Sequence, residues 1–152
     1  MLAGCVAFLL LFAASGAGQE AFGTWKMNAT RSTSAGAPQP RALVARFEAH
    51  PKGEVLTLDS RPRNGPATTF SSVLYLDGQE REYQGHSCSG TQSSRRLDRR
   101  TIEIVYERQD SWTRFIRRRP AQANELILDI TEKLSNGRRL ERHLILEKHR
   151  AN

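Results

Sequence analysis

The 152-residue sequence lacks several features that define common protein classes. It contains two cysteines, and only Cys88 lies beyond the N-terminal hydrophobic segment, so the rest of the chain cannot form an internal disulfide and must be stabilised by core burial. Glycine (11) and proline (6) are near average frequency, which excludes collagen-like and low-complexity chains. Hydrophobic residues make up only 38% of the chain, which excludes a multi-span membrane protein. They recur in strand-like runs, which argues against disorder, and a chain of 152 residues has the length of one domain.

The sequence also lacks the usual signatures of catalysis, metal binding and nucleic-acid recognition. It has no G-x-S-x-G nucleophile motif. His86 and Cys88 supply two possible ligands where zinc takes three or four, so we interpret them as part of a loop. The excess of 23 basic over 16 acidic residues comes without an aromatic-rich binding signature. We therefore expect no enzyme activity, no cofactor or metal, and no nucleic-acid partner.

The longest hydrophobic run lies at the N-terminus. Residues 6–14 are nine consecutive apolar residues, too few to span a bilayer, and the small residues Ser15-Gly16-Ala17 follow. This pattern predicts a signal peptide over residues 1–17, cleavage after Ala17, and export to a bacterial periplasm or the extracellular space. Cys5 precedes the apolar run instead of following it, which argues against a lipoprotein signal. The alternative is that this run is a strand or helix of the fold.

Most of the remaining chain, residues 18–152, alternates apolar and polar residues with the period of two that is typical of β-strands. Asp77-Gly78 and Asn136-Gly137 are hairpin-turn dipeptides. We predict ten strands at Gly23–Asn28, Arg41–Ala49, Gly53–Asp59, Thr68–Leu76, Gln79–Tyr83, Gln92–Leu97, Thr101–Arg108, Ser111–Arg119, Glu125–Leu134 and Arg139–Lys148.

The links between these strands are short, so neighbouring strands should be antiparallel. An open sheet of this length would expose two long edges, and closing it into a barrel removes them. We therefore predict an all-β fold, an antiparallel up-and-down meander of about 8–10 strands, closed or nearly closed into a barrel. A two-sheet sandwich is the alternative architecture.

The opening of the predicted domain, Gly23 to Ser32, reads GTWKMNATRS and resembles the G-x-W first strand of the calycins, which include lipocalins and fatty-acid-binding proteins. It is most similar to small exported bacterial lipocalin-like proteins that begin with G-T-W-K-L-N. Those proteins also carry a central Tyr-Asp-Gly-Lys and a terminal Tyr-Glu-Lys, which Leu76–Gln79 and Leu146–Lys148 match in part. The resemblance implies a lipocalin-like barrel more than a particular function.

The same resemblance assigns structural roles to three residues. In calycins the tryptophan of the first strand closes one end of the barrel, and an arginine from the last strand stacks on it. Gly23 and Trp25 would take the first role here, and Arg139 or Arg142 would supply the arginine.

Ligand-binding candidates follow from residues on the predicted inner face. Fatty-acid-binding proteins hold a carboxylate with Arg-x-Tyr in the last strand, and this chain has Arg142-His143-Leu144, so the arginine matches and the tyrosine does not. A buried arginine needs a partner, either a neighbouring carboxylate, a stack on Trp25, or an anionic ligand. Arg114 raises the same question. We assign Arg114, Arg142, Tyr106 and Phe115 to ligand binding, although large residues such as these last two could instead fill the interior.

Two functions remain open from the sequence. The first is noncovalent binding of a small hydrophobic or anionic molecule inside a monomeric barrel. The second is a module without a pocket that docks to an anionic polymer or a partner protein through an arginine-rich face, with Arg117, Arg118 and Arg119 at its centre.

Overall fold

The computed structural model describes residues 19–84, 89–108, 111–122 and 124–150. Within these residues, one 3-10 turn, η1 (Gln19–Ala21), precedes eleven strands. The strands are β1 (Gly23–Met27), β2 (Thr33–Ala35), β3 (Ala42–His50), β4 (Gly53–Arg61), β5 (Thr68–Leu74), β6 (Arg81–Gln84), β7 (Ser89–Arg96), β8 (Ile102–Arg108), β9 (Trp112–Pro120), β10 (Glu125–Leu134) and β11 (Arg139–His149). The ten predicted strands are confirmed within a few residues of their expected ends, whereas β2 and η1 were not predicted.

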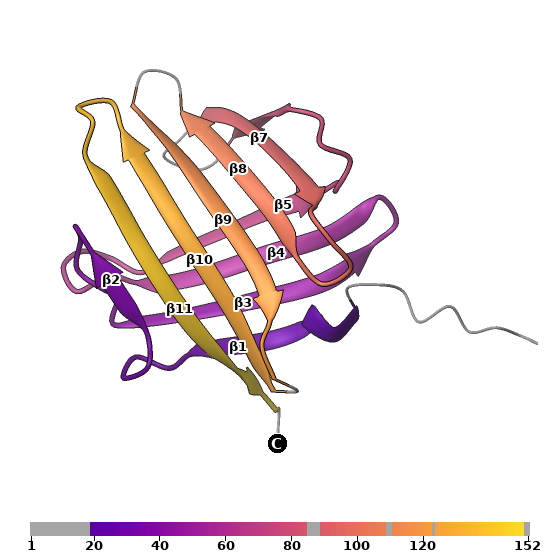
Figure 1. Cartoon of the computed structure of the whole chain (residues 1–152), viewed down its shortest axis with the longest axis horizontal. Helices are drawn as coiled ribbons and strands as arrows, with labels where there is room; N and C mark the ends of the chain where they lie inside the picture. Colours follow the sequence, from indigo (N-terminus) through magenta and orange to yellow (C-terminus); the bar gives the residue numbers. More distant parts are fainter. Residues whose placement is uncertain (1–18, 85–88, 109–110, 123, 151–152) are drawn as a thin grey trace, which may run out of the picture.

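All the strands belong to one antiparallel sheet that curls into a barrel (Figure 1). The strand order is β5-β4-β3-β1-β11-β10-β9-β8-β7-β6, and β2 pairs with β11 beyond the end of β1. The first strand, β1, pairs with the last strand, β11, and in this ladder Trp25 is opposite Lys148 and Met27 is opposite Leu146. In Figure 1 the β3–β5 half of the sheet passes behind the β8–β11 half, so the two halves enclose the core. The predicted all-β meander, closed or nearly closed, is confirmed.

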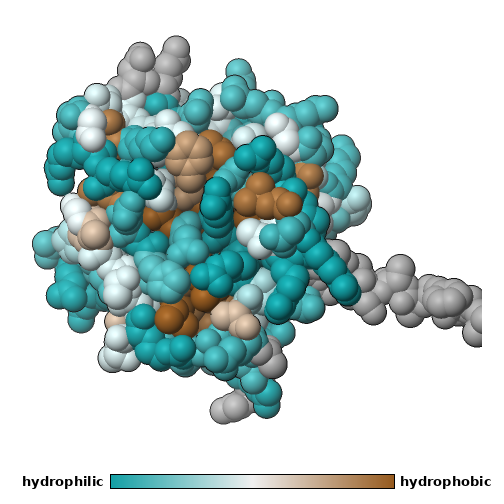
Figure 2. Space-filling view, viewed as in Figure 1, coloured by the Kyte–Doolittle hydropathy of each residue, from teal (hydrophilic) through white to brown (hydrophobic). Residues whose placement is uncertain are grey.

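Alternation along the strands sets which side chains face inward. On β10, Leu126, Leu128 and Ile130 are buried, and their β11 partners include Leu144 and Leu146, which are fully buried. The intervening positions face outward, and Figure 2, viewed as in Figure 1, shows a largely hydrophilic surface with separate hydrophobic patches. Among the described residues, no helix is long and apolar enough to cross a membrane.

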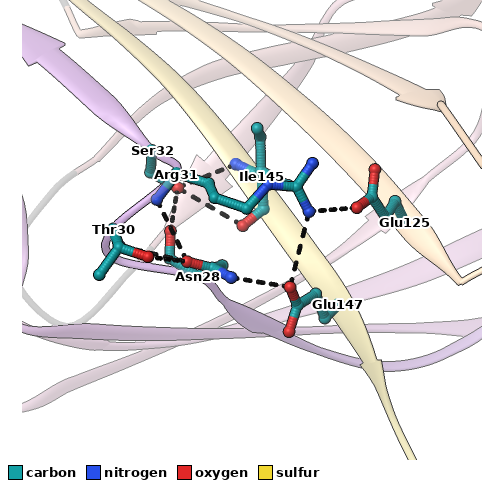
Figure 3. Close-up of polar contacts among 7 residues, drawn as sticks. All are labelled: Asn28, Thr30, Arg31, Ser32, Glu125, Ile145 and Glu147. Carbon is teal, nitrogen blue, oxygen red and sulfur yellow. Dashed lines mark hydrogen bonds and ion pairs between the residues drawn. The ribbon is translucent and has the colours of Figure 1, made fainter.

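The link between β1 and β2 explains the opening motif. Residues 28–32 leave the sheet after Met27, and β2 rejoins β11 with Thr33 opposite His143. The Ser32 hydroxyl donates to the Asn28 carbonyl at 2.7 Å and accepts the Ile145 backbone N–H at 3.0 Å, so it fills the ladder position that the chain vacates (Figure 3). Asn28 Oδ1 in turn accepts from the Thr30 hydroxyl at 2.8 Å.

An ion-pair cluster covers the same loop. Arg31 bonds to Glu125 of β10 and lies 3.7 Å from Glu147 of β11, which also accepts from the Asn28 amide (Figure 3). Most of the polar part of the motif GTWKMNATRS therefore builds the connection between β1 and β2 and faces away from the barrel interior.

The prediction of a β-hairpin at Asp77-Gly78 is wrong. β5 and β6 are consecutive along the chain but form no ladder with each other. Asp77 instead bridges Arg95 of β7, and Gly78 donates its backbone N–H to the Ser94 carbonyl at 2.8 Å. The left-handed backbone at Leu76 (φ 58°) and Gly78 (φ 75°) turns the chain across the gap, so the dipeptide makes a turn without pairing the strands on either side.

Candidate ligand-binding site

The two ends of the barrel differ in how completely side chains fill them. At one end, which we call the base, the inner-face residues Trp25, Phe47, Leu74, Ile102 and Leu146 are at most 1% exposed. At the opposite end, which we call the rim, the inner-face residues Leu58, Phe70, Trp112, Arg114 and Arg142 are only partly buried. Solvent therefore reaches the inner face at the rim and not at the base.

Trp25 lies at the centre of the base. Its indole N–H donates to the Ala21 carbonyl of η1 at 2.7 Å, and Lys148 Nζ lies 5.2 Å from its ring centre. Gly23 packs beside the same lysine, because a Cβ there would lie 3.2 Å from Lys148 Cε. Arg139 does not take the stacking role, since it lies at the other end of β11, exposed and paired with Glu141 at 2.6 Å. Lys148 occupies the position that the resemblance assigned to an arginine.

A buried ion pair also joins the two halves of the barrel near the base. Arg118 of β9 and Glu54 of β4 pair through both carboxylate oxygens, with side-chain exposures of 0% and 3%. The Arg118 guanidinium lies 4.5 Å from the Phe47 ring centre, and Arg96 approaches Glu54 at 3.8 Å. Arg118 is therefore an interior residue, which corrects its assignment to an exposed basic surface with Arg117 and Arg119.

The other two arginines of that run point outward and already have carboxylate partners. Arg117 contacts Glu103 at 3.2 Å, and Arg119 lies 3.6 Å from Asp129. Burial raises the pKa of the Glu103 carboxyl, but hydrogen bonds from Arg95 and Arg117 outweigh this effect and hold that pKa below its usual range. The run of three arginines is thus split between two faces of the sheet.

Near the rim, Arg114 and Arg142 share a single carboxylate on the inner face. Glu132 of β10 accepts from Arg114 Nε at 2.8 Å and from Arg142 Nη1 at 3.2 Å. Arg114 is directly opposite Glu132 in the β9–β10 ladder, and Arg142 is opposite Ile130 in the β10–β11 ladder. Two guanidinium groups with one carboxylate leave one excess positive charge in a partly enclosed site.

Glu132 was not identified from the sequence, although its spacing from Leu126, Leu128 and Ile130 places it on the inner face. The side-chain exposures of Arg114, Glu132 and Arg142 are 36%, 10% and 20%. The guanidinium groups are therefore neither fully solvated nor sealed off, which leaves them able to contact a small molecule at the rim.

Tyr106 adjoins this group, since it is opposite Arg114 in the β8–β9 ladder. Its ring packs edge-on against Phe70 (5.5 Å between centres) and Tyr83 (5.8 Å), and its hydroxyl is hydrogen-bonded to Ser72 at 3.1 Å. Burial raises the pKa of this phenol well above its usual range, so it stays neutral.

Phe115, the fourth residue assigned to ligand binding, lies elsewhere. It follows Arg114 on β9 and therefore faces outward, where Lys133 Nζ lies 5.2 Å from its ring centre. The alternation of β9 puts Trp112, Arg114, Ile116 and Arg118 on the inner face. The prediction that Phe115 lies among the ligand-binding residues is therefore wrong.

The inner face of β3–β5 at the rim carries apolar side chains beside the hydroxyls of Ser60 and Ser72. Leu58 of β4 is opposite Phe70 of β5, and Leu43 of β3 lies nearby on the same inner face. The rim half of the interior thus has two arginines with one carboxylate on β9–β11, and the apolar residues Leu43, Leu58 and Phe70 on β3–β5. This division suits a molecule with one anionic and one apolar part.

Sites of other kinds have less support. His86 and Cys88 lie outside the described residues, and within those residues no group of three His, Cys, Asp or Glu is placed to hold a metal ion. A groove of about 330 Å³ lies along β2, β10 and β11, where His143 contacts Asp129; its lining includes Arg142 but neither Glu132 nor Arg114.

Comparisons with known proteins agree with this architecture. No protein-family model matches the chain, and no curated protein matches it significantly. Among solved structures it is similar to the Schistosoma mansoni fatty acid binding protein in complex with arachidonic acid, with TM-score 0.57 and 10% identity over 89% of this chain and 100% of the other. It is also similar to As-p18, an extracellular fatty acid binding protein, with TM-score 0.56 and 12% identity over 88% and 99%. At such low identity the likeness concerns the fold alone: this chain forms an antiparallel β-barrel like that of the fatty acid binding proteins.

Proposed function

We propose that this protein noncovalently binds a small amphipathic molecule in the rim half of its barrel. Arg114 and Arg142 hold the anionic head group, and the apolar part lies against Leu43, Leu58 and Phe70. The observation that carries the proposal is the pair of partly exposed arginines sharing the single carboxylate of Glu132 opposite these apolar residues. The solved structures with this fold, which bind fatty acids, support the same class of ligand.

The experiment is a titration with a fluorescent long-chain fatty acid, followed by displacement with unlabelled fatty acid and with a fatty alcohol of equal length. Removing one charge-assisted hydrogen bond costs about 1.5–3 kcal/mol, so Arg114→Gln and Arg142→Gln should each raise the Kd of the acid about 10- to 150-fold. The fatty alcohol carries no charge and forms no ion pair with the arginines, so its Kd should change far less in these variants.

Arg139→Gln is the matched control, because it removes an arginine from the same strand on the outer face, where the side chain is 59% exposed. It should leave the Kd unchanged. Absence of saturable binding to the wild-type protein contradicts the proposal, and so does an equal effect of all three substitutions.

We also propose that the protein acts outside the cytoplasm, on the basis of the apolar segment at residues 6–14 and the small residues after it. Expression of the full chain in a bacterial host, followed by mass measurement of the exported protein, should give a mature chain that begins at Gly18. Retention of an uncleaved chain in the cytoplasm would contradict this proposal.

A further inference from the structure

The sheet has one seam without a backbone ladder, between β5 on one side and β6 with β7 on the other. A groove of about 250 Å³ follows this seam. It is lined by small and polar residues of the three strands, among them Ser71, Ser72, Tyr83, Gln92 and Ser94. Every other pair of neighbouring strands in the described sheet is joined by a backbone ladder, so the seam is the weakest line of the described barrel wall.

The base half of the seam is fastened through the backbone. Gly78 N–H bonds to the Ser94 carbonyl at 2.8 Å, and Leu76 N–H bonds to the Ser94 hydroxyl at 3.0 Å. The Gln92 amide also donates to the Val73 carbonyl at 3.2 Å. This half cannot open without breaking main-chain hydrogen bonds.

The rim half of the seam is held by side chains. Phe70 of β5 packs against Tyr83 of β6 with ring centres 5.1 Å apart, and both rings contact Tyr106. The hydrogen bond between Ser72 and Tyr106 spans the same place at 3.1 Å. Rotation of these side chains would open this half while leaving every strand ladder intact.

The position of this contact relates it to the proposed ligand site. Ser72 and Tyr83 line the groove and face inward, where they contact Phe70 and Tyr106, and Tyr106 adjoins Arg114. A molecule approaching over the rim would have to move its apolar part past the charged group of Arg114, Glu132 and Arg142. Through the seam, that part meets aromatic rings first.

We propose that the rim half of the seam is the lateral entrance for the amphipathic ligand, with Phe70, Tyr83 and the Ser72–Tyr106 hydrogen bond as its latch. This inference rests on the proposed function, because it concerns uptake of that ligand. The apolar part enters between β5 and β6, and the head group then reaches Arg114 and Arg142.

The test measures association rates by stopped-flow mixing with the same fluorescent fatty acid. Ser72→Ala removes the latch hydrogen bond and should raise the association and dissociation rate constants together by about two- to tenfold, with an unchanged Kd. Tyr83→Ala removes the ring between Phe70 and Tyr106 and should accelerate uptake further.

Ser71→Ala is the matched control. It removes the neighbouring hydroxyl of β5, which pairs with Thr57 across the β4–β5 ladder at 3.2 Å and takes no part in the latch. Its uptake rate should equal that of the wild type. Wild-type rates in Ser72→Ala and Tyr83→Ala, with normal affinity, would overturn the lateral entrance and leave uptake over the rim. Absence of any wild-type binding would overturn the proposed function and this inference together.

Discussion

The buried pair of Glu54 and Arg118 gives the sharpest prediction about stability. The two side chains are 3% and 0% exposed, and they connect β4 to β9 across the core. Arg118 Nε has no hydrogen-bond partner in the described structure, so Glu54 is the main source of compensation for this charge. Glu54→Ala would leave a buried guanidinium without a carboxylate, which costs about 3–5 kcal/mol in comparable sites.

Urea unfolding followed by tryptophan fluorescence measures this loss. With a urea slope of about 1.5 kcal/mol per M, the transition midpoint should fall by about 2–3 M without a change of slope. Glu141→Ala is the control, because Glu141 is 55% exposed and its pair with Arg139 contributes about 1 kcal/mol or less.

A double variant separates the charge effect from lost packing. Glu54→Leu with Arg118→Met removes both charges and keeps apolar volume, so it should recover most of the stability lost in Glu54→Ala. If Glu54→Ala costs no more than Glu141→Ala, the buried pair contributes no more to stability than an exposed one, which contradicts this prediction.

Three further predictions address other parts of the structure. Ser32→Ala should cost about 1–3 kcal/mol and speed hydrogen exchange at the Ile145 amide, which loses its acceptor; normal protection there would contradict the role of Ser32. Glu132→Gln removes the carboxylate that competes for the rim arginines, so a fatty acid should bind more tightly and a fatty alcohol equally well; weaker binding of the acid would contradict this. The lowered pKa of Glu103 means that its contribution to stability is complete above about pH 5 and is lost as the pH falls through that pKa, so Glu103→Gln should flatten the acid side of a Tm–pH profile.

Most strands were predictable because they alternate apolar and polar residues over most of their length and short turns separate them, whereas β6 and β7 lack this alternation. On β10, the alternation of Leu126, Leu128 and Ile130 fixes the inner face, and the same parity extends to Glu132. The short strand β2 gave no such signal, since its three residues hold their place through the Ser32 hydroxyl and the β11 ladder instead of through buried side chains.

The partners of the interior charges were not predictable from local patterns. Glu54 and Arg118 are 64 residues apart in sequence and meet only because the sheet curls. Inspection of parity alone could have placed Arg118 inside and Phe115 outside, because consecutive residues of a strand face opposite sides. The hairpin at Asp77-Gly78 failed for a different reason: a turn dipeptide fixes a local reversal but not whether the flanking strands pair.

In the proposed site, the ligand carboxylate lies against Arg114 and Arg142 inside the barrel. A fatty acid labelled with ¹³C at its carboxyl carbon tests it most directly, by NMR titration of the bound resonance with pH. We expect a distinct bound signal whose carboxyl pKa lies below that of an exposed carboxylate, and a rise of that pKa in Arg114→Gln and Arg142→Gln but not in Arg139→Gln. If the pKa of the bound carboxyl is the same in all four proteins, the carboxylate does not contact these arginines.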